Sequence, residues 1–322
     1  MMEELRIIFM GTPVFAVPSL EALLKEDFNV VAVITAPDRP SGRGLKTKPS
    51  PVKSYAAGHE IPVLQPTNLK DPVFIEELKS FRANLQIVVA FRMLPEIVWA
   101  MPHRGTFNLH ASLLPQYRGA APINHAIMNG EAETGVTTFF LRKEIDTGNI
   151  LFREKTPIGP EETFGELHDR LKHLGAGLVV RTARAIKEGM VRETPQHELL
   201  EEGDAIKKAP KIFRDDCRID WRSGINDIYN KIRGLSPYPA AYTKIINPEG
   251  REFEMKIYRT DKKEMPGSTG PHQIRTDGKT NLSVSVEGGE IIVREIQLAG
   301  KKRMETEEFL RGFQVTNKWK IS

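Results

Sequence analysis

The chain has 322 residues, a length that suggests two domains, and 40% hydrophobic with 27% charged residues is ordinary for a globular protein. This composition excludes intrinsic disorder as the main state, and the longest apolar run, residues 85–91, is too short to span a membrane. The one cysteine, Cys217, excludes an internal disulfide framework and a zinc site built from several thiolates. The first residues lack the pattern of a secretory signal, so we expect a cytoplasmic protein.

Positive charge is concentrated in the last third of the chain. The formal net charge is +4, while residues 210–322 alone hold 21 Lys and Arg against 16 Asp and Glu. Such a surplus is a weak indication of a polyanionic partner such as nucleic acid. A solvated basic surface without a partner explains the same charge equally well.

The first half of the chain alternates between strand-like and helix-like patterns. Apolar, β-branched runs typical of buried strands occupy residues 5–10, 28–34, 85–90, 106–109, 135–141 and 150–152. Helical spacing of apolar residues occupies 14–25, 73–81, 95–101, 123–128 and 163–187. Apolar strands separated by helices predict an α/β fold with a mostly parallel sheet covered on both faces. Such sheets bind ligands at the carboxyl ends of their strands.

The pattern changes after Met190. Residues 190–218 are rich in Gly, Pro, Glu and Lys, and we interpret them as a linker. A helix at 225–232 is then followed by strand-like segments at 242–246, 254–258, 272–275, 282–286 and 290–298, with turns expected at 247–250 and 287–289. This predicts a small β-barrel or sandwich. The predicted organisation is a first domain at 1–189, a linker at 190–218 and a second domain at 219–322.

Common nucleotide and metal motifs are missing from the sequence. Residues 11–13 follow the first strand without G-x-G-x-x-G, and residues 41–44 lack the Gly-Lys-[Ser/Thr] of a phosphate-binding loop. His168 and His173 do not have metal-binding spacing, so we expect no metal.

A basic segment at residues 39–53 stands out because it has no acidic residue and is interrupted by Pro and Gly. Its cations are Arg39, Arg43, Lys46, Lys48 and Lys53. A basic loop between a strand and a helix packs poorly but can grip phosphates, so we predict contacts with nucleic acid. A solvated charge run is the alternative interpretation.

The strongest constellation combines an amide, an imidazole and a carboxylate. Asn108 and His110 alternate along one predicted strand and so share a face, and Asp146 follows another strand. An amide can stabilise an oxyanion, a histidine can take a proton from an attacking amine, and a carboxylate can orient that histidine. These residue types suit direct acyl transfer to an amine, since no activated nucleophile is nearby in sequence. Taken singly, a structural histidine and a turn residue would account for His110 and Asp146.

The same residues carry a family resemblance. Asn108-Leu-His110, Ser112-Leu-Leu-Pro115 and Asp146-Thr-Gly148 resemble the 10-formyltetrahydrofolate-dependent formyltransferases. Further segments are similar to the methionyl-tRNA formyltransferase family, at residues 6–13, 37–44, 49–53, 117–123, 219–221, 232–233, 237–239 and 298–302. The resemblance covers nearly the whole chain.

This resemblance implies a Rossmann-like formyltransferase domain followed by an OB-like β-barrel. It implies transfer of the formyl group of 10-formyltetrahydrofolate to the α-amino group of methionyl initiator tRNA, in support of translation initiation. Asn108, His110 and Asp146 would be the catalytic set. The folate site would include Ser112, Leu113, Leu114 and Pro115, together with Arg92, Met93 and Leu94.

Contacts with tRNA are expected at two places in the chain. The basic segment matches the family's insertion that reaches the acceptor end, with Arg43 at the contacting position and Arg39, Lys46 and Lys48 beside it. Lys301 and Lys302 belong to the basic surplus of the second domain. We expect a monomer with no membrane contact.

The sequence departs from the family pattern at two places, and two other functions remain as alternatives. The segment after the buried strand, residues 91–95, resembles the folate loop of glycinamide ribonucleotide formyltransferases, and Tyr238 replaces a tryptophan common in the family. A formyltransferase acting on a small amine, such as glycinamide ribonucleotide or an amino sugar, leaves the basic segment and the second domain unexplained. A tRNA-binding protein without turnover is disfavoured by the intact catalytic set.

Overall fold

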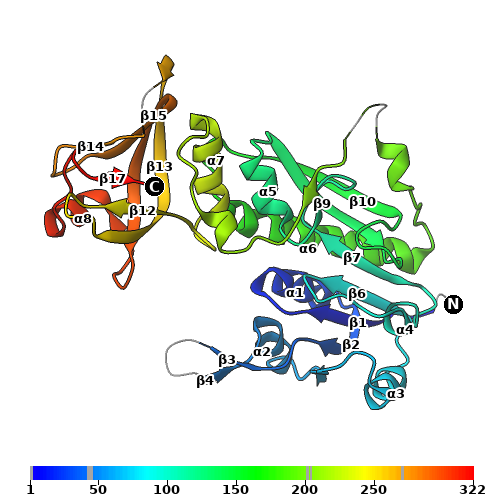
Figure 1. The fold of residues 1–322 in the computed structure, drawn as a ribbon. Helices are drawn as coiled ribbons and strands as arrows, with labels where there is room; N and C mark the ends of the chain where they lie inside the picture. The colour runs from blue at the N-terminus through cyan, green and yellow to red at the C-terminus, as the bar shows by residue number, and fades with distance from the viewer. Residues whose placement is uncertain (1–2, 42–45, 201–202, 204, 270–271) are drawn as a thin grey trace. The chain divides into compact units, whose positions relative to one another are not determined.

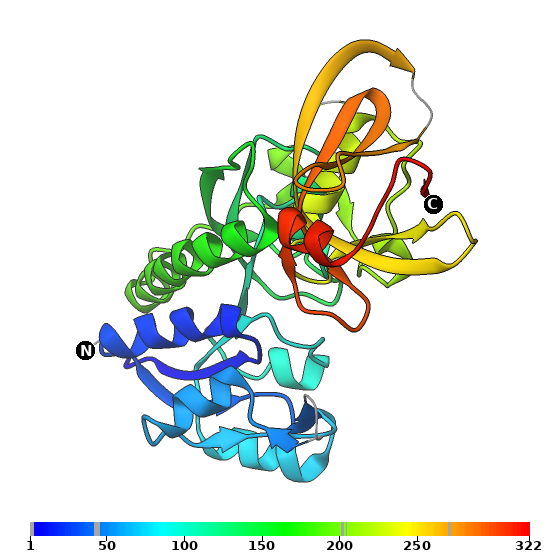
Figure 2. The same cartoon turned by 90° about the vertical axis from the view of Figure 1, so that its left-hand side faces the viewer.

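The structure of the protein is a computed structural model. It describes residues 3–41, 46–200, 203, 205–269 and 272–322. Its residues form two compact units (Figures 1 and 2). The first unit comprises residues 1–119, 135–156 and 168–208, and the second comprises residues 120–134, 157–167 and 209–322. Among the described residues, no helix combines the length and apolar character needed to cross a bilayer.

The first unit is built on a seven-stranded sheet with the order β10-β9-β7-β6-β1-β2-β5. The strands are β1 (Arg6–Gly11), β2 (Asn29–Ile34), β5 (Val63–Leu64), β6 (Leu85–Val89), β7 (Thr106–His110), β9 (Glu133–Phe140) and β10 (Ile150–Pro157). The pairs from β5 across to β7 are parallel, whereas β9 runs antiparallel to β7. The predicted mostly parallel, Rossmann-like sheet is therefore confirmed.

Helices flank this sheet, and several begin with the signals expected of their sequence. They are α1 (Val17–Lys25) after a 3₁₀ turn η1 (Val14–Ala16), α2 (Pro51–Ala57), α3 (Pro72–Ser80), α4 (Glu96–Trp99) and the long α6 (Phe164–Glu188), drawn green in Figure 2. Ser50 and Asp71 cap α2 and α3 by accepting hydrogen bonds from the backbone N–H groups of Lys53 and Val73, both at 3.0 Å. Proline follows each cap, where its missing N–H is harmless.

Burial of the central strands positions the residues that follow them. Ile7 to Met10 of β1 are fully buried, and β6 is buried along its whole length. Apolar residues of these strands pack with Phe74 and Leu78 of α3. Because β1 and β6 are buried on both faces, the loops at their carboxyl ends start from fixed points.

The second unit contains an antiparallel sheet with the order β14-β15-β13-β12-β17, and β16 pairs with β15. Its strands are β12 (Ala241–Ile246), β13 (Glu252–Thr269), β14 (Ile274–Thr276), β15 (Leu282–Leu298), β16 (Met304–Glu305) and β17 (Lys320–Ile321). Its helices are α5 (Pro122–Met128), α7 (Ile225–Leu235) and α8 (Thr306–Gly312), with a 3₁₀ turn η3 (Asp215–Cys217). This arrangement is consistent with the expected OB-like barrel.

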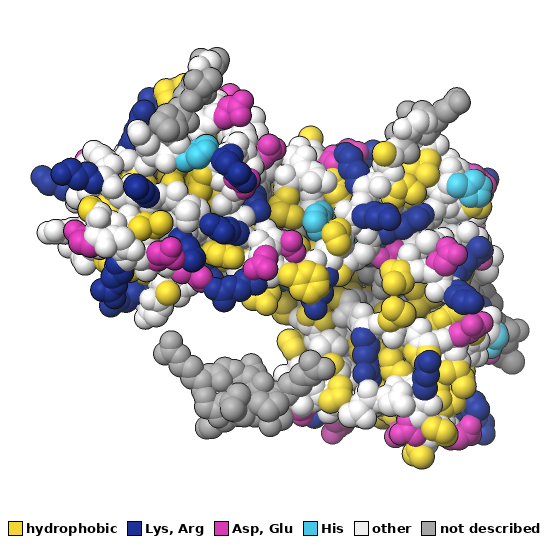
Figure 3. All heavy atoms as spheres, viewed as in Figure 1, with side chains coloured by type: hydrophobic (Ala, Val, Ile, Leu, Met, Phe, Trp, Pro, Cys, Tyr) yellow, Lys and Arg dark blue, Asp and Glu magenta, His cyan; other side chains and the backbone are white. Residues whose placement is uncertain are grey.

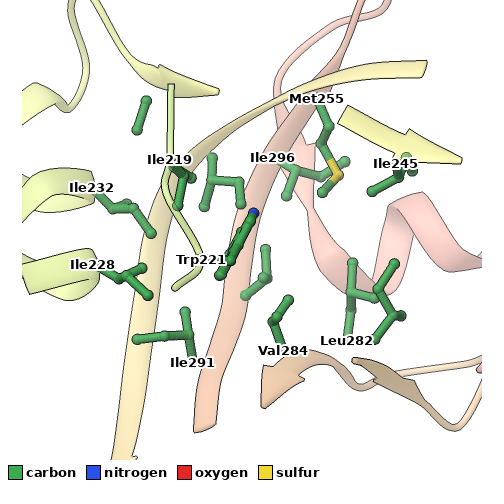
Figure 4. Packing of buried hydrophobic residues seen from close by; sticks show 14 of the residues in the cluster. Ile219, Trp221, Ile228, Ile232, Ile245, Met255, Leu282, Val284, Ile291 and Ile296 are labelled. Atoms are coloured by element: carbon green, nitrogen blue, oxygen red, sulfur yellow. The ribbon is translucent and has the colours of Figure 1, made fainter. Parts of the chain in front are cut away.

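The core of the second unit surrounds Trp221 (Figure 4). Its indole is 3% exposed and is packed among aliphatic side chains that include Ile228 of α7 and Ile296 of β15. The buried indole N–H donates a hydrogen bond to the hydroxyl of Thr243 at 2.8 Å, so no polar group of this ring is left without a partner. The sequence motif at 219–221 thus supplies a central core residue.

One predicted turn in this unit is wrong. Residues 287–289 were expected to separate two short strands, but they lie inside the 17-residue strand β15. Gly288 and Gly289 have φ values of +86° and +152°, and the register between β13 and β15 shifts between Glu264 and Thr269. Between these paired positions β13 has four residues, 265–268, opposite Gly288 alone, so the bulge lies in β13 and the two glycines of β15 stay within a continuous strand. The turn at 247–250 is confirmed, since the Gly250 N–H donates to the Asn247 carbonyl at 2.9 Å.

Candidate active site

Strand β7 carries two of the predicted catalytic residues. Asn108 and His110 are two positions apart on this strand, so both side chains lie on one face of the sheet. Asn108 is half-buried and pairs in register with Val88 of β6 and Phe139 of β9. His110 is the last residue of the strand and is 7% exposed.

The imidazole of His110 lies between a backbone carbonyl and a carboxylate. Its Nε2 is 2.9 Å from the carbonyl oxygen of Tyr117, and its Nδ1 is 3.9 Å from Oδ2 of Asp146. A carbonyl oxygen can only accept a hydrogen bond, so Nε2 carries the donated proton. In the neutral ring, Nδ1 is then the atom with a free lone pair. The fold therefore brings His110 and Asp146 together, as their predicted roles require.

Asp146 lies in the loop between β9 and β10. Its backbone φ is +55°, which is unusual for a residue other than glycine. Its carboxylate Oδ2 accepts a hydrogen bond from the backbone N–H of Gly119 at 3.0 Å, and its side chain is 12% exposed. A residue in this backbone region is held there by its surroundings, and such residues are often found at active sites.

The loop after His110 is held by hydrogen bonds that are buried or partly buried. The hydroxyl of Ser112 donates to the carbonyl of Gln116 at 2.7 Å, and the hydroxyl of Thr137 donates to the carbonyl of Ser112 at 2.7 Å. Ser112, Leu114 and Pro115 are buried, whereas Leu113 is half-buried. Of the four predicted folate residues in this loop, Leu113 is thus the one whose side chain is accessible to a ligand.

The second predicted folate segment follows β6. The guanidinium of Arg92 donates to the backbone carbonyls of Pro66 and Thr67. Met93 is 74% exposed, and Leu94 is buried in the core. The carboxyl ends of parallel β6 and β7 lie at one edge of the sheet, so Met93 and Leu113 follow neighbouring strand ends.

Comparison with known proteins agrees with this geometry. The family model described as formyl transferase matches residues 5–183, and the model of its C-terminal domain matches residues 211–314. A methionyl-tRNA formyltransferase of Bacteroides fragilis is 53% identical over 99% of this chain and 98% of its own length. The chain belongs to the methionyl-tRNA formyltransferase family. A second relative of that name, from Porphyromonas gingivalis, is 52% identical over 98% of both chains.

Solved structures place this family member in the wider formyltransferase fold. WlaRD, a sugar 3N-formyltransferase crystallised with dTDP and 5-N-formyl-THF, has a TM-score of 0.64 and 20% identity, covering 93% of this chain and all of its own. HypX from Aquifex aeolicus, in complex with tetrahydrofolic acid, has a TM-score of 0.62 and 17% identity, covering 96% of this chain and 47% of its own. At these identities the likeness shows the fold alone.

The basic segment of this formyltransferase begins with two short paired strands and ends in helix α2. Strands β3 (Arg39–Ser41) and β4 (Lys46–Lys48) pair antiparallel, with Arg39 opposite Lys48. Lys48 is exposed, whereas Arg43 and the side chains of Arg39 and Lys46 lie outside what the structure describes.

Lys53 differs from the other cations of the segment because it has partners within the protein. Its Nζ donates to Oδ2 of Asp38 and to Oε1 of Gln65, both at 2.6 Å. The hydrogen bond from Lys53 holds the pKa of Asp38 below its usual value. Lys53 thus connects α2 to Asp38, the residue before β3, and is not a free phosphate ligand.

Positive charge on the second unit is mixed with negative charge. Lys301 and Lys302 are both exposed, and Lys302 forms an ion pair with Glu308 at 2.8 Å. Figure 3 shows Lys and Arg interspersed with Asp and Glu over the visible face of this unit. In the described parts of the chain, no group of three or more His, Cys, Asp or Glu side chains is arranged to hold a metal.

Sequence reasoning missed two residues beside the predicted catalytic carboxylate, Asp146. Gln196 lies in a 3₁₀ turn, η2 (Gln196–Leu199), inside the segment interpreted as a linker, and it is 4% exposed. Its side chain contacts the loop of Asp146 and the guanidinium of Arg118. No local pattern marks Gln196, whereas Arg118 stands within the family motif at 117–123.

Proposed function

We propose that this enzyme transfers the formyl group of 10-formyltetrahydrofolate to the α-amino group of methionyl initiator tRNA, and thereby supports translation initiation. The observation that carries the proposal is the similarity to methionyl-tRNA formyltransferases along 99% of the chain, second domain included. A glycinamide ribonucleotide transformylase, in contrast, covers only 59% of this chain at a TM-score of 0.51. An enzyme for that small acceptor leaves the second domain without a role.

The proposed reaction is a direct attack of the methionyl amine on the formyl carbon of the folate. A new C–N bond forms, and the carbonyl oxygen gains negative charge that the Asn108 amide stabilises by hydrogen bonding. The amine proton passes to Nδ1 of His110, and the Asp146 carboxylate lies 3.9 Å from the cation so formed. The bond to N10 of the folate then breaks, and N10 takes up a proton to release tetrahydrofolate.

The residues at the strand ends fit a folate donor. Met93 and Leu113 provide accessible apolar surface at the carboxyl ends of β6 and β7, where a flat pterin ring can be covered. Arg92 is already bonded to the carbonyls of Pro66 and Thr67, so in this proposal it orders the loop beside the ring. The folate complexes of the structural neighbours support a donor of this class.

We further propose that the chain divides by function at the predicted boundaries. Residues 1–189 would carry out catalysis and folate binding, residues 190–218 would connect the domains and include Gln196 beside the loop of Asp146, and residues 219–322 would bind tRNA. The match of a separate C-terminal family model at 211–314 and the positive charge of residues 210–322 support this division.

A transfer assay with three acceptors tests the function. With 10-formyltetrahydrofolate as donor, methionyl initiator tRNA should be formylated, while glycinamide ribonucleotide and a nucleotide-linked amino sugar should not. Filter binding of charged and uncharged initiator tRNA is measured alongside. Formylation of a small acceptor instead, or tRNA binding without any transfer, would refute the proposal.

Replacement of Arg43 with alanine should impair the use of tRNA more than the use of folate. We expect a higher KM for methionyl-tRNA, an unchanged KM for folate, and a salt dependence of tRNA binding reduced by about one phosphate contact. The control is Lys25→Ala, which removes an exposed lysine paired with Glu21 on α1. An equal effect of Arg43→Ala on both substrates would contradict a contact between the loop and phosphate.

A further inference from the structure

The side chain of Gln196 is buried, and both its amide nitrogen and its carbonyl oxygen have hydrogen-bond partners. Its Nε2 donates to the backbone carbonyls of Asp146 and Gly148, both at 2.8 Å. Its Oε1 accepts from Nε and Nη2 of Arg118, at 3.0 and 2.7 Å. Because a guanidinium only donates and a carbonyl only accepts, these four contacts determine which end of the amide faces which partner.

These contacts hold the catalytic loop from two sides. The carbonyls that Gln196 binds flank Thr147 and belong to the loop in which Asp146 has its positive φ. Gly119 follows Arg118 directly, and its N–H donates to the Asp146 carboxylate at 3.0 Å. Gln196 therefore joins the backbone of Asp146 to the chain segment that also binds the side chain of Asp146.

The position of Gln196 is itself determined by contacts that do not involve Asp146. Thr194 exchanges two backbone hydrogen bonds with Ile150, at 2.8 and 2.9 Å. Leu199, at the end of the same 3₁₀ turn, packs against a small core that includes Leu114 and Phe139. The amide is thus presented to the loop from a fixed support, as a positioning residue requires.

We propose that Gln196, together with Arg118, is a positioning residue that keeps the carboxylate of Asp146 facing His110. The proposal rests on the proposed function, because Asp146 has its catalytic role there. Neither residue touches substrate in this proposal; both act through the loop. Small displacements of a catalytic group cost rate steeply, so loss of the bridge should lower kcat and not weaken substrate binding.

Gln196→Glu is the sharpest test because it changes one group and preserves the shape of the side chain. A glutamate can still accept from Arg118, but its other oxygen faces the carbonyls of Asp146 and Gly148 without a proton to donate. We expect kcat for formylation of methionyl-tRNA to fall on the order of tenfold, with both KM values changed less than about threefold. Gln196→Met, which removes both sets of hydrogen bonds, should give a loss at least as large and serves if the glutamate variant fails to fold.

Asn149→Ala is the matched control. Asn149 lies on the same loop, but its amide donates outward to Glu193 at 2.8 Å and not to the backbone around Asp146. This variant should keep kcat within about twofold of the parent enzyme. An equal loss of kcat in Asn149→Ala and Gln196→Glu would overturn the proposal, because any disturbance of the loop would then suffice.

A double-mutant cycle separates positioning from a general structural role. If Gln196 acts through Asp146, the Gln196→Glu substitution should lower kcat less than about twofold when introduced into Asp146→Asn. Additive losses, or an unchanged kcat in Gln196→Glu, would overturn the proposal. A parent enzyme that does not formylate methionyl-tRNA would instead refute the proposed function, so the two failures are distinct.

Discussion

Replacing His110 with alanine is expected to lower kcat for formyl transfer by roughly 10²–10⁴-fold, the usual loss for a general acid–base residue. The reason lies in the hydrogen bonding of the ring. Nε2 donates to the Tyr117 carbonyl, so Nδ1 is the ring atom placed to take the amine proton, beside Asp146. Steady-state kinetics with saturating methionyl-tRNA and folate measure the loss, and filter binding confirms that tRNA is still bound.

His110→Gln distinguishes catalysis from support of the loop. A glutamine can restore the hydrogen bond to the Tyr117 carbonyl but offers no basic nitrogen. Its kcat should therefore stay close to that of the alanine variant. Near-normal turnover in either variant, with tRNA binding intact, would show that His110 has only a structural role.

Replacing Gly148 with alanine is expected to lower kcat by about 10²-fold and also to lower Tm. A Cβ at Gly148 would lie 1.6 Å from the carbonyl oxygen of Phe140 and 2.8 Å from its carbonyl carbon. Neither atom belongs to a flexible side chain, so the loop must move away from the end of β9. Asp146 is two residues earlier in that loop and would move with it. Kinetics and thermal unfolding of the purified variant measure both effects.

Gly177→Ala is the control for this substitution. Gly177 lies in the exposed middle of α6, and nothing is within 4 Å of an added Cβ. Alanine is favoured over glycine in a helix by about 1 kcal/mol, so this variant should be more stable and equally active. A Gly148→Ala enzyme with the kinetics of Gly177→Ala would contradict the close approach at Phe140.

Six of the seven strands in the first unit's main sheet were predictable because each has a strong local signal, whereas the two-residue strand β5 was not predicted. Residues 5–10 and 85–90 are nearly continuous apolar runs, and the structure has β1 and β6 there, buried on both faces. The helix expected at 95–101 is shorter than predicted, since α4 spans only Glu96–Trp99. Proline marks where that helix can begin, but its end depends on packing and not on a local signal.

The second unit shows where local signals mislead. Consecutive glycines usually mark a turn, and on that ground residues 287–289 were expected to end a strand. The partner strand β13 continues alongside, and pairing resumes after the extra residues 265–268 of β13, so the glycines lie inside a continuous strand. Whether a flexible residue ends a strand is decided by the neighbouring strand, which is distant in sequence.

By itself, the sequence determined the parallel sheet, the placement of Asn108 and His110 on one strand face, and the family, because strand alternation and motif spacing are local properties of the chain. Only the tertiary structure decided that Asp146 approaches His110, that Lys53 is bound within the protein, and that Gln196 reaches the loop of Asp146 from 50 residues away. Hydrogen bonds between residues far apart in sequence leave no periodicity or composition to detect. They exist because folding brings two segments together, and for Gln196 the support comes from the pairing of Thr194 with Ile150.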